Sequence, residues 1–350
     1  MAGKRRSWAT GATTRLGGLV DAAILGAMRL NFDRKVPLPV EDRRAALHDV
    51  IAFYRRHGEA LFAEPRAANP TIEKRGNLPG GGGIVDLAWP STYEPALPAI
   101  AAHYLGFEAN RRACARVFRH DASTARNTIV LVHGYRGGQF FVEERAFPVR
   151  WLYKLGLDVA LFTLPFHALR GNARTPPWPS ANPARSNEGF GQAIHDLRAL
   201  VKYLAPPALA MAGMSLGGYT TALYATVEPL AFSCPMIPVA SFPDLYWHHG
   251  DGRPERLRAE REGITLPMMR DAMAIHTPLL RAPKIAGDRM LVVAAEGDRI
   301  APPEHAERLA EHFGAELLRF AGGHVLQLGR GDAFRALARK LAGAGLIERR

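Results

Sequence analysis

The stretch Gly213-Met214-Ser215-Leu216-Gly217-Gly218 decides the fold of this chain. It follows a short apolar run, residues 208–212, and precedes a segment with the pattern of a helix. A serine in the frame Gly-x-Ser-x-Gly, between a strand and a helix, lies in a sharp and strained turn. The glycines let the strand and the helix approach closely, which pushes the serine hydroxyl outward. The stretch therefore predicts an exposed nucleophile at the end of a strand.

Strands and helices alternate along most of the remaining sequence. Continuous apolar runs, such as residues 128–132 and 159–163, are typical of strands buried on both faces. The alternation predicts an α/β fold with a mostly parallel central sheet and helices on both faces. The predicted strands are 115–119, 128–132, 159–163, 208–212, 232–240, 290–294 and 316–320, and the predicted helices between them are 141–155, 188–204, 216–226, 304–313 and 332–341.

The first 112 residues do not follow this alternation. We expect an N-terminal extension of helices and loops, with an amphipathic helix at 41–64 and another helix within 95–113. Residues 66–95 are rich in proline and contain the run Gly80-Gly81-Gly82-Gly83. This run lacks the Gly-Lys-Ser/Thr that completes a phosphate-binding loop, so it predicts a flexible linker.

Residues 113–350 are predicted to form the main domain, which contains two long segments outside the alternation. The segment 165–189 is a loop rich in proline, asparagine and arginine, and the segment 242–287 separates two strands of the sheet. Long insertions in a compact domain are usually lids or binding loops. We therefore expect a cap or lid at about residues 242–287.

Two further residues complete a catalytic constellation with Ser215. A serine hydroxyl is a weak nucleophile until a histidine, oriented by a carboxylate, takes its proton. Asp298 follows the strand 290–294, and His324 follows the strand 316–320. Both therefore lie at the carboxyl ends of strands, where open α/β sheets place their sites. Ser215, Asp298 and His324 are the predicted catalytic residues, with Glu296 as the alternative acid.

With these motifs the chain resembles the α/β-hydrolase fold superfamily. The motifs that carry the resemblance are His133-Gly134, the stretch around Ser215, Gly297-Asp298 and Gly323-His324, and they follow the family's order of serine, acid and histidine. The segment 165–189 and Cys234-Pro-Met-Ile-Pro238 are also similar to a branch of α/β-hydrolase domain-containing proteins. The resemblance implies the fold and a serine-based hydrolysis, without indicating the substrate.

The resemblance also implies an oxyanion hole. A negative charge that develops on a carbonyl oxygen needs preorganised donors. The expected donors are the backbone N–H of Leu216, which follows the nucleophile, and that of Tyr135, in the loop after the strand 128–132. His133 in such a motif usually shapes the loop by hydrogen bonding.

Three residues are candidates for contacts with the substrate: His133, His167 and Arg170. The last two follow the strand 159–163 in Leu164-Pro-Phe-His-Ala-Leu-Arg-Gly171 and could meet an anionic group. The alternative for both is a role in ordering the loop.

The composition limits the partners and cofactors. The formal net charge is +12, and most of the excess lies in the first 150 residues. The sequence has neither zinc-finger spacing nor basic runs interleaved with aromatic residues, so we expect no nucleic-acid partner. Cys114 and Cys234 fit no metal spacing and are expected to be buried thiols, which favours a reducing, cytoplasmic compartment. The predicted mechanism requires no metal and no organic cofactor.

The N-terminal segment leaves open a contact with membranes. The stretch 16–30 is apolar but short and contains Asp21 and Arg29, so we do not expect it to span a bilayer. A helix packed on the domain is the first interpretation, and the alternatives are a disordered arm or an interfacial helix, peripheral to the inner membrane, whose basic residues face anionic lipids. The residues on the apolar face of this helix are Leu16, Leu19, Val20, Ala23, Ile24 and Ala27.

The sequence thus predicts a serine hydrolase of carboxylic esters or thioesters, acting on a small-molecule or lipid ester with a hydrophobic acyl group. A peptidase or amidase is one alternative. The other is a non-catalytic protein of the same fold that serves as a binding or scaffold module, which the presence of Ser215, Asp298 and His324 together disfavours.

Overall fold

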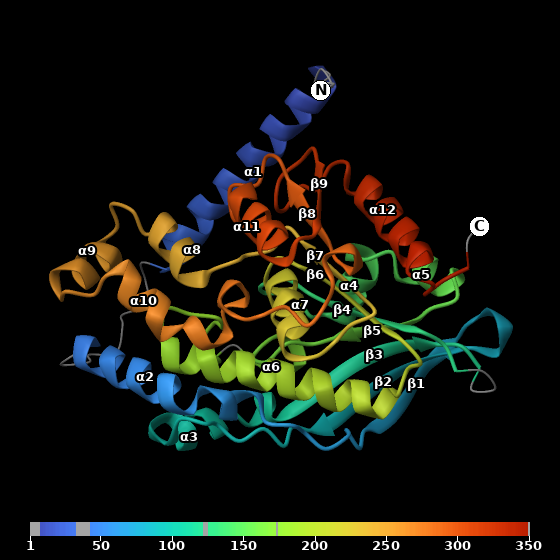
Figure 1. The fold of residues 1–350 in the computed structure, drawn as a ribbon, viewed down its shortest axis with the longest axis horizontal. Helices are drawn as coiled ribbons and strands as arrows, with labels where there is room; N and C mark the ends of the chain where they lie inside the picture. The colour runs from blue at the N-terminus through green and yellow to red at the C-terminus, as the bar shows by residue number, and fades with distance from the viewer. Residues whose placement is uncertain (1–7, 33–42, 122–124, 173, 349–350) are drawn as a thin grey trace.

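The computed structural model describes residues 8–32, 43–121, 125–172 and 174–348. Within these residues the strands form a single nine-stranded sheet in the order β1-β2-β3-β5-β4-β6-β7-β8-β9 (Figure 1). The strands are β1 (Thr71–Asn77), β2 (Gly83–Pro90), β3 (Arg112–Arg119), β4 (Thr128–Val132), β5 (Asp158–Phe162), β6 (Leu209–Met214), β7 (Phe232–Met236), β8 (Leu291–Ala295) and β9 (Glu316–Phe320).

Most of the sheet is parallel. Parallel pairing runs from β5 through β4, β6, β7 and β8 to β9, while β1, β2, β3 and β5 are joined by antiparallel pairing. Every residue of β4 is buried. Val130 and Val132 belong to one hydrophobic cluster, and Ile129 and Leu131 belong to another, so the two faces of the strand serve different cores.

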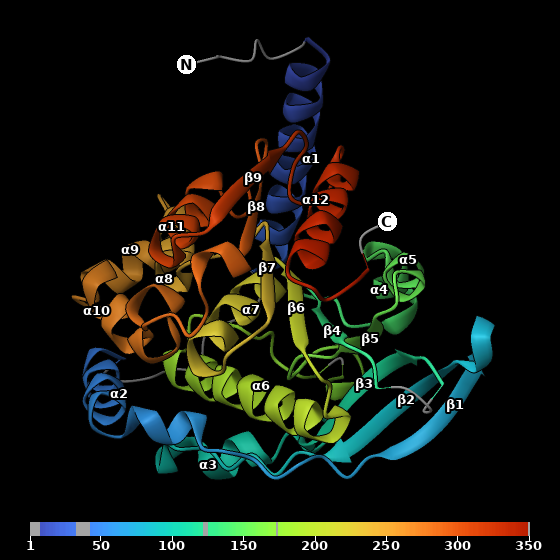
Figure 2. The same cartoon turned by 45° about the vertical axis from the view of Figure 1, so that its right-hand side comes forward.

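Helices cover both faces of the sheet (Figures 1 and 2). Leu197 and Leu309, from helices on one face, belong to the same cluster as Val130, whereas Leu152 and Leu337, on the other face, cluster with Ile129. The predicted fold class is therefore confirmed. The first face carries α6 (Pro183–Leu204), α7 (Leu216–Val227) and α11 (Pro303–Phe313), and the second carries α4 (Phe140–Ala146), α5 (Val149–Lys154) and α12 (Arg330–Gly343).

The expectation that residues 66–95 are mostly loop, with a flexible linker at the glycine run 80–83, is wrong. These residues supply β1 and β2, an antiparallel hairpin that extends the sheet beyond β3. Gly80 and Gly81 lie in the turn, with φ of 76° and 80°. β1 is an edge strand whose residues are mostly exposed and include Glu73, Lys74 and Arg75, so it lacks the apolar alternation on which the prediction relied. The sheet thus continues across the predicted boundary between residues 112 and 113.

The insertion at residues 242–287 is built from short helices. Ile264 and Ala272 of the insertion form a hydrophobic cluster with Leu47 and Ile51 of α2, so the insertion and the N-terminal segment pack against each other. The insertion contains α8 (Phe242–His249), α9 (Pro254–Arg261) and α10 (Leu266–Ala272), and the N-terminal segment contains α2 (Arg43–His57) and α3 (Pro98–Leu105). The 3-10 turns of the described chain are η1 (Gly58–Phe62), η2 (Pro79–Gly81), η3 (Glu108–Arg111), η4 (Ala168–Arg170), η5 (Ala274–His276), η6 (Pro278–Leu280) and η7 (Gly287–Arg289).

The first helix, α1 (Trp8–Phe32), packs on the domain through a face that the apolar pattern does not predict. Leu16 and Leu19 are 50% and 68% exposed, whereas Gly17, Gly18 and Asp21 are buried. The glycines explain the choice of face, because a helix without side chains at these positions can touch another backbone directly. The side chains of Ile24 and Ala27 lie outside the described residues. In the described part of the chain, no helix combines the length and the apolar character that crossing a bilayer requires.

Candidate active site

Ser215 occupies the sharp turn predicted between strand and helix. It joins β6 to α7 with φ 56° and ψ −113°, a conformation that residues with a side chain rarely adopt. A Cβ atom on Gly213 would lie 2.2 Å from the carbonyl oxygen of Gly217, and one on Gly217 would lie 2.0 Å from that of Val132. Glycine is therefore required at both positions. The backbone N–H of Ser215 donates to the carbonyl of Met236 at 2.9 Å, which ties the turn to β7.

The structure brings Ser215, His324 and Asp298 together from three separate loops. Nε2 of His324 lies 2.8 Å from Oγ of Ser215, and Nδ1 of His324 lies 2.7 Å from Oδ2 of Asp298. The loops follow β6, β8 and β9, so three strands of the parallel part of the sheet deliver the side chains at their carboxyl ends. In this arrangement the imidazole can accept the hydroxyl proton while the carboxylate holds the ring.

The carboxylate of Asp298 is held from its other side. Its Oδ1 accepts hydrogen bonds from the backbone N–H groups of Ile300 and Ala301, at 2.9 and 2.7 Å. Asp298 is only 3% exposed, so these bonds replace the water that a carboxylate would otherwise bind. The carboxylate that contacts His324 is thus that of Asp298 and not that of the alternative acid, Glu296.

The surroundings of His324 raise its pKa. Burial alone would lower the pKa, but the charge and the hydrogen bond of Asp298, together with the charge of Asp21, outweigh it, so the pKa lies above the ordinary value. The raised pKa means that the pocket favours the imidazolium form. An imidazolium is the species that forms when the histidine takes a proton from a serine.

The loop after β4 lies against the serine. A Cβ on Gly134 would be 3.5 Å from Cβ of Ser215. His133 is buried, with Nδ1 at 2.7 Å from the carbonyl oxygen of Gly134 and Nε2 accepting the backbone N–H of Leu164 at 2.9 Å. Burial lowers the pKa of His133 to about 3, so the ring is neutral. His133 therefore joins the loops after β4 and β5, and both of its nitrogens are engaged.

The two backbone amides predicted as oxyanion donors belong to Tyr135, which follows Gly134, and to Leu216, which follows Ser215. Leu216 is the first residue of α7, where N–H groups have no partner within the helix. Among the described residues, neither amide donates to another protein group. The lack of another acceptor is what the prediction of an oxyanion hole requires of these two amides.

His167 lies behind the oxyanion loop. Its ring contacts those of His133, Tyr135 and Trp178, with centroids 5.0, 6.1 and 6.0 Å away. Nδ1 lies 2.9 Å from the carbonyl oxygen of Pro165, and burial lowers the pKa of His167 to about 4. A neutral, buried ring supports the loop and is not suited to attract an anion.

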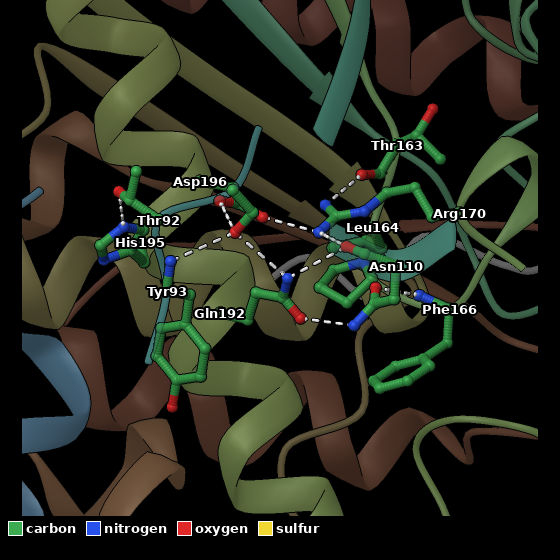
Figure 3. Close-up of polar contacts among 12 residues, drawn as sticks. Thr92, Tyr93, Asn110, Thr163, Leu164, Phe166, Arg170, Gln192, His195 and Asp196 are labelled. Carbon is green, nitrogen blue, oxygen red and sulfur yellow. Dashed lines mark hydrogen bonds and ion pairs between the residues drawn. The ribbon is translucent and has the colours of Figure 1, made fainter. Parts of the chain in front are cut away.

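Arg170 belongs to a buried polar network rather than to a substrate pocket. Its side chain is fully buried, and Nη2 lies 2.6 Å from Oδ2 of Asp196 in α6. The guanidinium also donates to the carbonyls of Thr163 and Asn110 at 3.2 and 3.0 Å (Figure 3). Gln192, on the same helix as Asp196, binds Asn110 as well. Arg170 thus fastens the loop after β5 to α6, and the alternative of a loop-ordering role describes its contacts.

Sequence reasoning missed one residue of the site, Asp21 of α1. Its carboxylate is fully buried and accepts the backbone N–H of His324 at 2.6 Å. In the sequence, Asp21 is notable only as a charge that interrupts an apolar stretch. The signal that could have found it is the pair Gly17-Gly18 one helical turn earlier, which marks the helix face for a close contact.

The remaining predictions on thiols and metals concern other parts of the molecule. Cys114 and Cys234 are buried free thiols, as predicted, and burial raises the pKa of Cys234 to about 12. The described residues contain no group of three or more histidine, cysteine, aspartate or glutamate side chains arranged to hold a metal ion.

Comparison with known proteins supports the fold. No family model matches the sequence, and no curated protein matches it either. Among solved structures, an acetyl xylan esterase from Paenibacillus sp. R4 superposes with a TM-score of 0.60 at 14% identity, covering 89% of this chain and 97% of that chain. Acetyl xylan esterase 1 from Thermoanaerobacterium sp. JW/SL YS485 gives a TM-score of 0.58 at 13% identity, covering 87% and 99%. The chain therefore has the α/β-hydrolase fold.

Proposed function

We propose that this chain is a serine hydrolase that cleaves a carboxylic ester or thioester through an acyl-enzyme on Ser215. The observation that carries the proposal is the continuous chain of contacts from Oγ of Ser215 to His324, at 2.8 Å, and on to Asp298, at 2.7 Å. The α/β-hydrolase fold and the strained turn at Ser215 support it, because both are the setting in which such a serine acts.

Acylation follows from this geometry. Oγ of Ser215 attacks the carbonyl carbon of the substrate while its proton moves to Nε2 of His324. The carbonyl oxygen becomes an oxyanion, which accepts hydrogen bonds from the N–H groups of Leu216 and Tyr135. Asp298 keeps the proton on Nδ1 and stabilises the imidazolium. The tetrahedral intermediate then collapses, and the leaving alcohol or thiol takes the proton from Nε2.

Deacylation repeats these steps with water as the nucleophile. Water gives a proton to Nε2 of His324 and attacks the acyl carbon, which again places a negative charge in the oxyanion hole. The second collapse breaks the bond between the acyl carbon and Oγ of Ser215, and Oγ recovers the proton from the imidazolium. The products are a carboxylic acid and the free enzyme.

A hydrophobic acyl group is the substrate that we favour. Val325, next to His324, is an apolar side chain that is 51% exposed. Exposed apolar side chains beside a site favour an apolar ligand. The competing substrate is an acetyl ester, which the names of the two superposed esterases suggest. Rates on p-nitrophenyl esters of increasing chain length separate the two, and a preference for acetate over all longer esters would contradict a hydrophobic acyl group.

A fluorophosphonate probe tests the enzyme class directly. Such a probe phosphonylates an activated serine, so we expect wild-type protein to be labelled and Ser215→Ala to remain unlabelled. Ser180→Ala, in the loop before α6, is the matched control and should be labelled like the wild type. A wild-type protein that is not labelled would favour the non-catalytic alternative, and equal labelling of Ser215→Ala would place the reactive serine elsewhere.

Paired p-nitrophenyl esters and p-nitroanilides distinguish ester from amide hydrolysis. The amine that leaves an amide is a poorer leaving group than an alcohol and must be protonated as it departs, so an esterase cleaves p-nitroanilides far more slowly than the matching esters. We expect ester hydrolysis at least about 100-fold faster, a difference of about 2.7 kcal/mol in activation free energy.

We also propose a peripheral contact between α1 and anionic membranes. Leu16 and Leu19 are 50% and 68% exposed on this helix, and the chain carries a net charge of +12. Apolar side chains beside basic ones favour an anionic lipid surface. Leu16→Gln with Leu19→Gln should reduce co-sedimentation with phosphatidylglycerol vesicles. Leu257→Gln on α9, at a residue that is 48% exposed, is the control. Equal sedimentation of all variants would contradict the contact.

A further inference from the structure

We propose that Asp21 of α1 is a positioning residue of the active site, which holds the backbone of the His324 loop and stabilises the imidazolium during catalysis. This inference rests on the proposed function, because it assigns Asp21 a role in the reaction of Ser215. It adds to the hydrolase fold a part that comes from the N-terminal helix.

The carboxylate of Asp21 bridges the loops that carry the acid and the base. Its Oδ2 accepts the backbone N–H of His324 at 2.6 Å and that of Arg299 at 3.2 Å, and its Oδ1 accepts the N–H of Val325 at 3.0 Å. Arg299 follows Asp298 directly, and Val325 follows His324. One side chain therefore fixes the backbone on both sides of the contact between His324 and Asp298.

Glycines bring α1 close enough for this bridge. A Cβ on Gly17 would lie 2.2 Å from the backbone nitrogen of Gly323, and one on Gly297 would lie 2.3 Å from the carbonyl oxygen of Thr14. The backbone of the helix therefore touches the backbone of both catalytic loops. Asp21 lies one turn further along the same face of α1, which places its carboxylate under the N–H group of His324.

The charge of Asp21 indicates more than a structural link. Asp21 is fully buried, and a buried carboxylate is costly in free energy unless it is well hydrogen-bonded. A neutral amide of the same shape would accept at one of the two oxygen positions only and would turn an N–H group toward the donor at the other. A carboxylate accepts all three bonds, and it also places a negative charge beside a ring that becomes positive in the transition state. Consistent with this, the charge of Asp21 contributes to the raised pKa of His324.

A test of Asp21 must distinguish its effect on His324 from the effects of the other charged groups on the catalytic loops. Asp298 acts on the imidazole through both its charge and its hydrogen bond. Glu296 and Arg299 lie on the loop after β8, in the same stretch as Asp298. A change in Asp21 alone leaves these groups in place, so a shift in the titration of His324 would report on the charge of Asp21.

The rate of fluorophosphonate labelling as a function of pH tests this role without knowledge of the substrate. We would compare the wild type, Asp21→Asn, Asp21→Glu and the control Asp49→Asn, at an exposed residue of α2, between about pH 5 and pH 9, a range that brackets the ordinary pKa of histidine. In Asp21→Asn, we expect the half-maximal rate at a lower pH and a plateau about 10- to 100-fold below the wild type. Asp21→Glu should retain the wild-type midpoint with a reduced plateau, and Asp49→Asn should match the wild type throughout.

The outcomes separate this inference from the proposed function. A wild type that is not labelled contradicts the proposed function. A wild type that is labelled, with an Asp21→Asn variant of the same rate and midpoint, contradicts the role of Asp21 alone. A reduced plateau without a shift in midpoint would reduce Asp21 to a structural link. If circular dichroism shows that Asp21→Asn does not fold, the labelling of Asp21→Glu tests the role of Asp21 instead. A plateau rate equal to that of the wild type in Asp21→Glu would then overturn the positioning role.

Discussion

At the scale of the residue, the pKa of His324 sets the pH dependence of the site. The imidazole must be neutral to accept a proton from Ser215, and its pKa is raised above 6.5. The neutral fraction therefore grows as the pH rises through this higher pKa. We expect kcat/KM to increase with pH and to reach half of its maximum above pH 6.5. A pH profile on a p-nitrophenyl ester measures this midpoint, and a value below 6.5 would contradict the assignment.

Asp298 and Glu296 provide a matched comparison on one loop. Asp298→Asn keeps the shape of the side chain but removes the charge that orients His324, so we expect kcat/KM to fall by about 10⁴-fold, as in other triads. Glu296→Gln should change it by less than about tenfold, since His324 is bound by Asp298. A larger loss in Glu296→Gln than in Asp298→Asn would reverse the assignment of the acid.

At this scale, the sequence predicts the three residues of the triad but not Asp21, which binds the backbone of His324. Ser215, Asp298 and His324 each follow an apolar strand, a pattern that is visible locally. Asp21 contacts His324 across 303 positions of the chain. No local pattern relates residues so far apart, and a single acid in a helix is more often exposed to solvent.

At the scale of the element, α1 depends on the glycines at its contact with the catalytic loops. An alanine at position 17 would place its Cβ 2.2 Å from the backbone of Gly323, so the helix must move away. We expect Gly17→Ala to lose about 1–3 kcal/mol of stability and to lower the rate of labelling. Labelling kinetics and urea denaturation measure the two effects.

The control for this variant lies on the same helix. Nothing lies within 4 Å of a Cβ built on Gly11. Gly11→Ala should therefore keep the wild-type rate and gain about 0.5–1 kcal/mol of helix stability, because glycine is a poor helix former. If both variants behaved alike, the close contact at Gly17 would not matter for the site.

The hairpin of β1 and β2 shows why an element can be missed. Among the strands that the structure describes, β1 pairs with β2 alone. Its charged side chains remain in water, as in Arg75, which lies against Glu73 and Asp86. Its pattern is that of a polar loop. The inner parallel strands β4, β6, β7 and β8 are almost entirely buried and largely apolar, so the sequence predicts the centre of the sheet well and the edge formed by β1 poorly.

At the scale of the whole molecule, the network around Arg170 joins parts that are distant in the chain. The ion pair of Arg170 and Asp196 is completely buried, so removing one charge leaves the other unpaired. Arg170→Gln should therefore cost about 3–5 kcal/mol of stability. The KM for neutral and anionic esters should change equally, since Arg170 has no exposed surface. Urea denaturation and steady-state kinetics check both, with Arg174→Gln as the exposed control.

A KM that rises only for anionic esters in Arg170→Gln would contradict this structural role and would indicate that Arg170 contacts the substrate. The sequence alone leaves both roles open, because an arginine in a loop after a strand suits either. The choice depends on Asp196, 26 positions away on α6, and on the carbonyl of Asn110, 60 positions away.

The bridge from Asp21 to Val325 spans 304 positions, which has a consequence for the order of synthesis. Helix α1 leaves the ribosome well before the loop that it holds, because the nine strands of the sheet lie between them in the sequence. During elongation the strands can pair as they emerge, but Asp21 has no partner until that loop arrives. In a nascent chain, Ser215 thus emerges well before His324, whose backbone Asp21 holds. Under the proposed function, the full rate of hydrolysis therefore requires that α1 and the loop of His324 have come together.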